Sequence, residues 1–325
     1  MTLTVSAAVE TWPIAGSFTI SRGSRTEVVA VVAEISDGTH TGRGECAPYP
    51  RYDETPQSVV TAIGQTDLGD RPDRQVLKQK MPAGAARNAL DCALWDLEAK
   101  CSGIRVAERC GITALKPVMT AYTLSLGTPQ TMGEAAARAT QYPLLKVKLG
   151  GEGDAARIAA VRAAAPDARL IVDANEAWSN DNFEENMAAC AKAGVVLVEQ
   201  PLPAGKDALL ARIAHAVPVC ADESAHVTTD LERLAGKYEA VNIKLDKAGG
   251  LTEALAMMQQ AQARGLMVMV GCMVGTSLAV APGLILAQGA DIVDLDGPLL
   301  LARDRQPGLA YTGGLVEPPS ASLWG

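Results

Sequence analysis

The chain has 325 residues, of which 48% are hydrophobic and 20% are charged, and its formal net charge is −8 at pH 7. This composition is typical of a globular protein with a large core, and the length allows about two domains. The acidic balance excludes a nucleic-acid partner, because no basic excess offsets the charge of a polyanion. We therefore expect a small-molecule substrate.

Three features of the sequence indicate where in the cell the protein is expected. The seven cysteines are scattered, odd in number and without a Cys-x-x-Cys pair, which predicts reduced thiols in a cytoplasmic protein. No lysine or arginine precedes Arg22, so the charged start of a secretory signal is missing. Residues 265–290 carry no charge, but several glycines and Pro282 interrupt them. That pattern favours a strand plus a buried helix over a membrane span.

Residues 1–112 are expected to form a small α+β domain. The β-branched run 28–35 and the turn at Asp37-Gly38 predict a hairpin that continues toward Gly44. Residues 83–100 repeat apolar side chains at helical spacing.

Ahead of this hairpin, residues 21–25 read Ser-Arg-Gly-Ser-Arg and predict a short polar loop. The loop could reach over a binding site and offer Arg22 or Arg25 to a carboxylate. A solvated loop without a binding role is the equal alternative.

Farther along, eight short apolar runs each end in a reactive or polar group, at intervals of 22 to 28 residues. One strand, one helix and two connections need about 25 residues, so this rhythm predicts eight βα units closed into a barrel over residues 113–303. The groups that end the runs are Thr123, Lys148, Asp173, Glu199, Asp222, Lys244, Cys272 and Asp294. The tail 304–325, rich in glycine and proline, is expected to pack onto the first domain.

Asp173, Glu199 and Asp222 each follow a buried apolar run, so neighbouring strands place three carboxylates at the barrel mouth. Hard oxygen ligands with room for water and substrate suit Mg²⁺. Any one of these acids by itself is better explained as the cap of the next helix. Three together, beside lysines, favour the metal.

The lysines indicate the chemistry. Lys146 and Lys148 are two apart on one strand and share a face, while Lys244 ends the strand opposite. Structural ion pairs are the alternative. Two lysines on opposite sides of a bound carbon, beside a dication, suit removal of a proton next to a carboxylate, and neighbouring positive charge would lower an ammonium pKa toward neutrality. A lysine Schiff base would explain neither the second lysine nor the carboxylates.

Asp294 and Asp296 end the eighth run and share a face, which suits a cationic substrate group such as an α-ammonium. A helix cap or an added metal ligand is the alternative. None of the three histidines ends a predicted strand, which disfavours a histidine base, and we expect His226 in a surface loop.

Together these motifs resemble the enolase superfamily, within its muconate-cycloisomerase-like subgroup. Nearly the whole chain is similar to the bacterial L-Ala-D/L-Glu epimerases, which act on dipeptides. The motifs are Lys-x-Lys at 146–148, Asp173-Ala-Asn175, Glu199-Gln-Pro, Asp222-Glu-Ser and Asn-Ile-Lys244, and the similar segments lie around 21–27, 44–52, 82–97, 242–256 and 294–298.

The resemblance implies a modified (β/α)7β TIM-type barrel of class α/β, with an α+β capping domain made of residues 1–112 and the tail 304–325. It implies one Mg²⁺ per subunit on Asp173, Glu199 and Asp222, with Lys148 and Lys244 as the acid/base pair. Substrate contacts are implied for Thr123, Lys146, Cys272, Met273, Val274, Asp294, Asp296 and either Arg22 or Arg25, with Asn175 and Glu223 in support.

The expected function is Mg²⁺-dependent epimerisation of the carboxy-terminal residue of a dipeptide. The expected substrate is L-Ala-D/L-Glu from cell-wall peptides. One lysine would take the α-proton, an enediolate would form, and the other lysine would return a proton to the opposite face. An o-succinylbenzoate synthase or a muconate-type cycloisomerase is the alternative, but their substrates carry no ammonium for Asp294 and Asp296. A non-enzymatic binding barrel is disfavoured by the intact lysines and acids. The sequence leaves the oligomeric state open, a homo-oligomer included.

Overall fold

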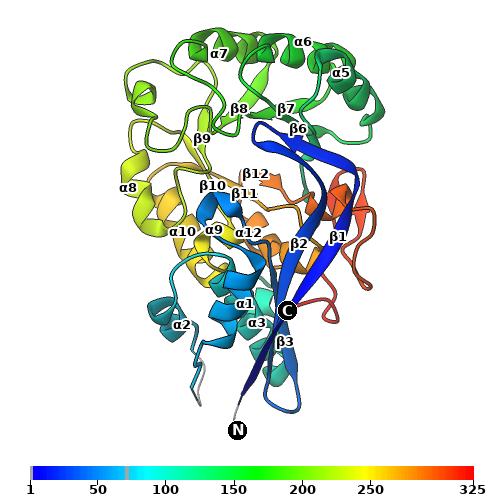
Figure 1. Ribbon diagram of the computed structural model, residues 1–325, viewed down its shortest axis with the longest axis vertical. Coiled ribbons are helices and arrows are strands. Elements are labelled where there is room, and N and C mark those ends of the chain that lie inside the picture. Colours follow the sequence, from blue (N-terminus) through cyan, green and yellow to red (C-terminus); the bar gives the residue numbers. More distant parts are fainter. Residues whose placement is uncertain (1–2, 70–72) are drawn as a thin grey trace.

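The computed structural model describes residues 3–69 and 73–325. An eight-stranded sheet, parallel throughout, curls into a barrel, and a three-stranded antiparallel sheet with its helices forms a second unit beside it (Figure 1). This arrangement confirms the predicted α/β barrel with an α+β capping unit. The domain boundaries at residues 112 and 303 stay predictions.

The capping unit is a meander of three strands covered by helices. Its strands are β1 (Thr4–Ile20), β2 (Gly23–Ser36) and β3 (Thr41–Cys46). Its helices are α1 (Pro56–Gly64), α2 (Arg74–Lys80), α3 (Ala85–Ser102) and α4 (Val106–Arg109).

The prediction of a loop over residues 21–25 is wrong. The turn is confined to Ser21 and Arg22, and Arg25 lies in β2, paired with Phe18 of β1. Because β1 and β2 form one long hairpin, the arginines sit at its tip. In Figure 1 this tip, in blue, reaches β6 and β7, and the Ser21 hydroxyl donates a 3.0 Å hydrogen bond to the Asn175 carbonyl.

Two glycines seat α3 directly on β3. A Cβ atom on Gly42 would lie 2.1 Å from the Ala93 carbonyl oxygen, and one on Gly44 would lie 2.1 Å from that of Ala89. Such distances are far below contact, so only glycine permits this approach of strand and helix. The hairpin and α3 therefore hold a fixed relation to each other.

The barrel strands appear where the apolar runs predicted them. They are β5 (Tyr122–Leu124), β6 (Leu144–Lys148), β7 (Arg169–Asp173), β8 (Val195–Glu199), β9 (Val219–Ala221), β10 (Ala240–Lys244), β11 (Met267–Gly271) and β12 (Ile292–Asp294). Neighbours in sequence are neighbours in the sheet. The Ala121 amide donates to the Val293 carbonyl at 2.8 Å, which joins the first strand's start to the last strand.

Helices cover the outside of the barrel. They are α5 (Pro129–Arg138), α6 (Asp154–Ala164), α7 (Phe183–Lys192), α8 (Leu231–Leu234), α9 (Leu245–Ala248), α10 (Leu251–Ala263), α11 (Ser277–Val280) and α12 (Gly283–Ala287). The connection from β8 to β9 holds only the 3₁₀ turn Ala208–Ala211. Within residues 3–69 and 73–325, none of the helices has the length and apolarity needed to span a membrane.

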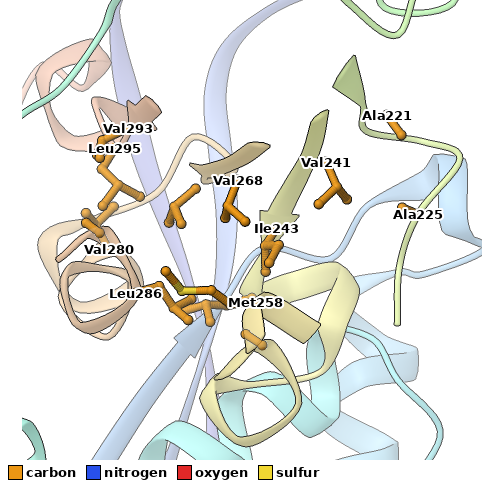
Figure 2. Packing of buried hydrophobic residues seen from close by; sticks show 14 of the residues in the cluster. Ala221, Ala225, Val241, Ile243, Met258, Val268, Val280, Leu286, Val293 and Leu295 are labelled. Atoms are coloured by element: carbon orange, nitrogen blue, oxygen red, sulfur yellow. The ribbon is translucent and has the colours of Figure 1, made fainter. Parts of the chain in front are cut away.

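Strand alternation divides the side chains between two cores. On β10, Val241 and Ile243 point outward into a cluster that includes Met258 of α10 and Leu286 of α12 (Figure 2). The alternate positions point into the barrel. There each strand, or the residue just before it, contributes one side chain to an inner apolar layer: Ala121, Leu144, Ile171, Leu197, Cys220, Ala240, Met269 and Ile292.

The tail contacts both units. Its strands β13 (Tyr311–Thr312) and β14 (Leu315–Val316) form a small sheet with β4 (Val118–Met119) at the start of the barrel segment. Trp324 is fully buried, and its Nε1 donates a 3.0 Å hydrogen bond to the Cys92 carbonyl on α3.

Candidate active site

The inner apolar layer positions the polar layer above it. Two residues farther along each strand, the next inward side chain lies one step closer to the barrel mouth. The eight positions are Thr123, Lys146, Asp173, Glu199, Asp222, Asn242, Gly271 and Asp294, and all are buried. Strand pairing sets Asp173 beside Glu199, whereas the partner of Asp173 on β6 is Lys148 and not Lys146. Residues far apart in sequence thereby meet in one ring at the barrel mouth.

Lysine ammonium groups lie among these acids. Lys146 Nζ is 2.6 Å from Asp294 Oδ2 and 2.7 Å from Glu199 Oε2. A further two residues along β6, Lys148 Nζ lies 2.6 Å from Asp173 Oδ2. On the other side of the ring, Lys244 Nζ lies 2.6 Å from Asp222 Oδ2. Each buried charge thereby has an opposite charge in contact.

The ionisation of the acids follows from these contacts. Burial alone would raise the pKa of Asp173, but the ammonium groups of Lys148 and Lys146 overcome it and hold that pKa below its usual range. Burial and the neighbouring Asp173 raise the pKa of Glu199 to about 7. Adjacent carboxyls therefore differ in their affinity for a proton.

The expectation of a lowered lysine pKa concerns lysines beside a bound dication and stays a prediction, whereas the protein groups alone act in the opposite direction. Burial by itself would lower the pKa of Lys244, but the carboxylates of Asp222 and Glu199 outweigh it and raise that pKa well above its usual range. Lys146 behaves in the same way, because Asp294 and Glu199 flank it. Here the contacts between lysine and acid dominate over repulsion between lysines.

The acid pair on β12 is held in a defined way. Asp296 accepts a 2.6 Å hydrogen bond from the Thr123 amide, and burial together with the charge of Asp294 raises its pKa to about 7. Asp294 Oδ1 is buried and accepts no hydrogen bond from the described residues. Because Asp294 Oδ2 is already paired with Lys146, the capacity left for a cation or a donor is that of Asp294 Oδ1.

The residues at Asp173, Glu199 and Asp222 fit a divalent cation such as Mg²⁺. Glu199 Oε2 and Asp222 Oδ1 are both buried and lie 2.7 Å and 2.6 Å from the ammonium groups of Lys146 and Lys247, so positive charge already balances these carboxylates. The donors are hard carboxylate oxygens on three adjacent strands, the type of ligand that Mg²⁺ prefers.

Asn175 and Glu223 lie next to these carboxylates. The backbone amide of Asn175, at φ 44, donates a 2.9 Å hydrogen bond to Asp173 Oδ1. Glu223 accepts a 2.9 Å hydrogen bond from Arg22, and burial together with the charge of Asp222 raises its pKa to about 7.

A cavity of about 360 Å³ lies above the ring, between the barrel and the capping unit. Asp173 and Glu199 lie beneath it, in contact with the lysines. The other residues singled out in the sequence all line it: Arg22, Arg25, Thr123, Lys146, Lys148, Asn175, Asp222, Glu223, Lys244, Cys272, Met273, Val274, Asp294 and Asp296.

The two arginines at the hairpin tip differ in the hydrogen bonds that their side chains make. Arg22 donates to Glu223 Oε1 and to the Asn175 carbonyl, both at 2.9 Å, and to the Tyr49 hydroxyl at 3.1 Å. The guanidinium carbon of Arg25 lies 5.3 Å from the centre of the Tyr49 ring, and this guanidinium donates no hydrogen bond to the described part of the chain. Arg25 is therefore the arginine that is free to bind a ligand.

Sequence patterns missed some of the residues around the site. Buried Lys247 lies 2.6 Å from Asp222 Oδ1 and donates to the Ala225 carbonyl at 2.8 Å, which orients that carboxylate. The signal in the sequence is a second lysine three residues after Lys244, directly after Asp246. His226 lies in a loop, as expected, but its ring is half-buried and packs edge-on to that of Tyr52, a residue of the cavity wall, with 4.5 Å between the ring centres.

An α/β barrel with acids and lysines at the carboxyl ends of its strands, closed over by a capping unit, has the architecture of a barrel enzyme. Residues 2–111 match the family model described as mandelate racemase / muconate lactonizing enzyme, N-terminal domain, and residues 131–321 match the enolase C-terminal domain-like model. The chain belongs to the enolase superfamily, as its motifs predicted, and it is an enzyme.

Individual relatives are similar over almost their entire length. An L-Ala-D/L-Glu epimerase of Escherichia coli is 47% identical, covering 96% of this chain and 98% of its own. An N-acetyl-D-glutamate racemase of a Pseudoalteromonas species is 45% identical, covering 91% and 95%. A solved enolase-family structure from Agrobacterium tumefaciens, with homology to dipeptide epimerases and with bound sodium and L-Ala-L-Glu, is 54% identical, covers all of both chains and has a TM-score of 0.97.

Proposed function

We propose that this protein is a dipeptide epimerase that inverts the α-carbon of the carboxy-terminal residue, with L-Ala-D/L-Glu as its substrate. The observation that carries the proposal is that Lys148 and Lys244 open from different strands into one cavity, above a set of buried acids. The similarity to an L-Ala-D/L-Glu epimerase over nearly the whole chain supports the substrate.

In the proposed reaction, the neutral amine of one lysine takes the α-proton of the terminal residue. The electron pair of the broken C–H bond moves into the adjacent carboxylate, which becomes an enediolate. The ammonium of the other lysine then returns a proton to the opposite face of the carbon, so the stereocentre is inverted. Lys148 on β6 and Lys244 on β10 are suited to these roles because they approach the cavity from opposite sides of the ring.

Asp173, Glu199 and Asp222 would hold one Mg²⁺ per subunit beneath the substrate. When bound, this ion would supply positive charge that stabilises the enediolate and neutralises the acids that otherwise keep the pKa of Lys244 high. Asn175, which donates to Asp173, and Lys247, which contacts Asp222, would keep those two carboxylates in place.

The cavity walls suit the two ends of an Ala-Glu dipeptide. Asp294 and Asp296 would bind the α-ammonium, and Arg25, whose donors are free, would bind the side-chain carboxylate of glutamate. Thr123, Lys146 and the segment Cys272–Val274 would complete the contacts.

The same acids argue against other substrates. N-acetylglutamate and the substrates of o-succinylbenzoate synthases and muconate-type cycloisomerases carry no ammonium, so Asp294 Oδ1 and the carboxyl of Asp296 would gain no charged partner from them. We further propose that the dipeptide comes from cell-wall peptides recycled in the cytoplasm. The free state of all seven cysteines supports that compartment.

The test is incubation with L-Ala-L-Glu and Mg²⁺ in deuterated water, followed by NMR and optical rotation. We expect deuterium at the glutamyl α-carbon together with formation of L-Ala-D-Glu, and at most weak exchange with N-acetyl-L-glutamate. Absence of exchange across a panel of L,L-dipeptides would refute the proposal. Faster turnover of N-acetylglutamate than of any dipeptide would show that Asp294 and Asp296 do not select an ammonium.

A further inference from the structure

A second group of chemically reactive side chains lies far from the barrel mouth. Asp37 and His40 belong to the turn between β2 and β3, and Cys101 lies in the last turn of α3. Cys101 Sγ lies 3.2 Å from Asp37 Oδ2 and 3.8 Å from His40 Nδ1, and the latter two atoms are 3.6 Å apart. A sulfur, a nitrogen and an oxygen donor thus converge from two separate elements.

The three separations match one face of a tetrahedral metal site. With bonds of about 2.0 Å to nitrogen and oxygen and about 2.3 Å to sulfur, tetrahedral Zn²⁺ places its ligand atoms about 3.3 to 3.6 Å apart. The observed separations, from 3.2 to 3.8 Å, fall around this range. Only small side-chain movements would be needed to bring all three atoms to a metal.

The backbone holds these ligands in position. Asp37 Oδ1 accepts hydrogen bonds from the amides of Thr39 at 2.8 Å and His40 at 2.7 Å, which leaves Oδ2 facing the cysteine. The close seating of β3 on α3 at Gly42 fixes the turn relative to the helix end. The nearby Lys100 ammonium does not compete, because it donates to the Thr41 carbonyl and to Asp96, both at 2.7 Å.

We propose that Asp37, His40 and Cys101 form a binding site for Zn²⁺ or a similar transition-metal ion, with water as the fourth ligand. Thiolate and imidazole select such ions over Mg²⁺ and Ca²⁺, which prefer oxygen donors alone. On binding, the Cys101 thiol releases its proton to solvent, and the thiolate and carboxylate together balance the charge of the dication.

This site is independent of the one at the barrel mouth. It lies at the end of β2 opposite to Arg22, and the 14 residues of β2 span roughly 40 Å. In Figure 1 the turn after β2 lies at the β3 end of the blue hairpin, away from the tip that meets the barrel. Metal bound there would tie the turn to the helix end and stabilise the capping unit against unfolding.

The test uses Co²⁺ as a spectroscopic substitute for Zn²⁺, in a non-thiol reductant and with excess Mg²⁺ to occupy the carboxylates at the barrel mouth. We expect one equivalent of Co²⁺ to produce a thiolate-to-cobalt charge-transfer band, and Zn²⁺ to abolish it by competition. Cys101→Ser should remove the band, whereas Cys110→Ser, which alters a half-buried cysteine elsewhere, should keep it.

His40→Ala and Asp37→Ala should each weaken Co²⁺ binding roughly tenfold or more. Epimerase activity in Mg²⁺ should be the same in Cys101→Ser as in the unaltered protein. The proposal is overturned if the unaltered protein gives no band, if Cys101→Ser retains it, or if both the His40 and Asp37 variants bind Co²⁺ with unchanged affinity.

Discussion

Lys148 and Lys244 are buried residues of the same type that contact different acids, Asp173 and Asp222. If each serves one face of the α-carbon, neither can replace the other. We expect Lys148→Ala and Lys244→Ala each to slow epimerisation by about 10² to 10⁴, the usual contribution of a general base. Each variant should still exchange the α-proton of one epimer with deuterium but not that of the other.

The measurement is deuterium incorporation into L-Ala-L-Glu and L-Ala-D-Glu separately. Lys237→Ala is the matched control, because this lysine pairs with Asp207 outside the cavity and should leave both rates unchanged. A Lys244→Ala variant that still interconverts the epimers at the normal rate would contradict the two-base reaction.

The arginines at the hairpin tip lead to a second prediction, about substrate recognition. Loss of a charge-assisted hydrogen bond costs about 1.5 to 3 kcal/mol, so Arg25→Gln should raise KM for L-Ala-L-Glu by about 10- to 100-fold. The KM for L-Ala-L-Ala should change little, since that substrate has no side-chain carboxylate.

Arg22→Gln provides the contrast. Because Arg22 holds Glu223 and the Asn175 carbonyl, its loss should impair both dipeptides to a similar degree. Equal effects of Arg25→Gln on the two substrates would remove Arg25 from the recognition of glutamate.

Among the contacts between elements, β3 packs against α3 with no room for a side chain at Gly42 or Gly44. A methyl group on Gly42 would overlap the Ala93 carbonyl and the Leu97 amide, which are backbone atoms that cannot turn aside. Gly42→Ala should therefore lower the free energy of unfolding by about 3 kcal/mol, the upper range for overpacking. Denaturant-induced unfolding measures the change.

Gly64→Ala is the control for that experiment. Gly64 ends α1, and a Cβ atom there would meet nothing within 4 Å. We expect this substitution to be neutral or slightly stabilising, because alanine favours helix more than glycine does. Equal stability of the Gly42→Ala and Gly64→Ala proteins would mean that strand and helix separate at little cost.

At the scale of the whole molecule, a buried acid joins the barrel to the capping unit. Asp246 of α9 accepts hydrogen bonds from the Ala47 amide at 3.0 Å and from Asn88 Nδ2 at 2.9 Å. Burial raises the pKa of Asp246 to about 7. The folded protein therefore keeps this proton to higher pH than the unfolded chain does.

The raised pKa of Asp246 predicts the direction in which the free energy of unfolding changes with pH. Between the unfolded pKa of about 4 and the folded pKa of about 7, the folded state binds more protons, so stability contributed by Asp246 is present at low pH and lost as pH rises. Asp246→Asn, which mimics the protonated acid, should match the unaltered protein at pH 5 and exceed its stability at pH 8.

Unfolding of both proteins at the two pH values provides the test. In Asp246→Asn, the free energy of unfolding should still fall as pH rises, but less steeply than in the unaltered protein. Some pH dependence remains because burial also raises the pKa of Asp91 to about 6. A stability difference between the two proteins that is the same at pH 5 and pH 8 would show that Asp246 is ionised in the folded state over this range.

Local patterns in the amino-acid sequence suffice to predict the barrel and most residues of the ring at its mouth. Parallel strands buried on both faces must be short apolar runs, so a run that ends in Lys148, Asp173 or Glu199 marks a strand end directly. The period of two along a strand then places Lys146 above Leu144 and Asp173 above Ile171. These relations are local, and they hold whatever the rest of the chain does.

Contacts and pKa shifts that depend on distances between segments become apparent only in the folded protein. The half-exposed strand β1 carries no buried run to mark it, and its pairing with β2 is what moves Arg25 out of a loop. Contacts with acids on other strands raise the pKa of Lys244, and Cys101 meets Asp37 although 64 residues separate them in sequence. Coulomb and hydrogen-bond energies depend on separation in space, which folding sets and residue spacing does not.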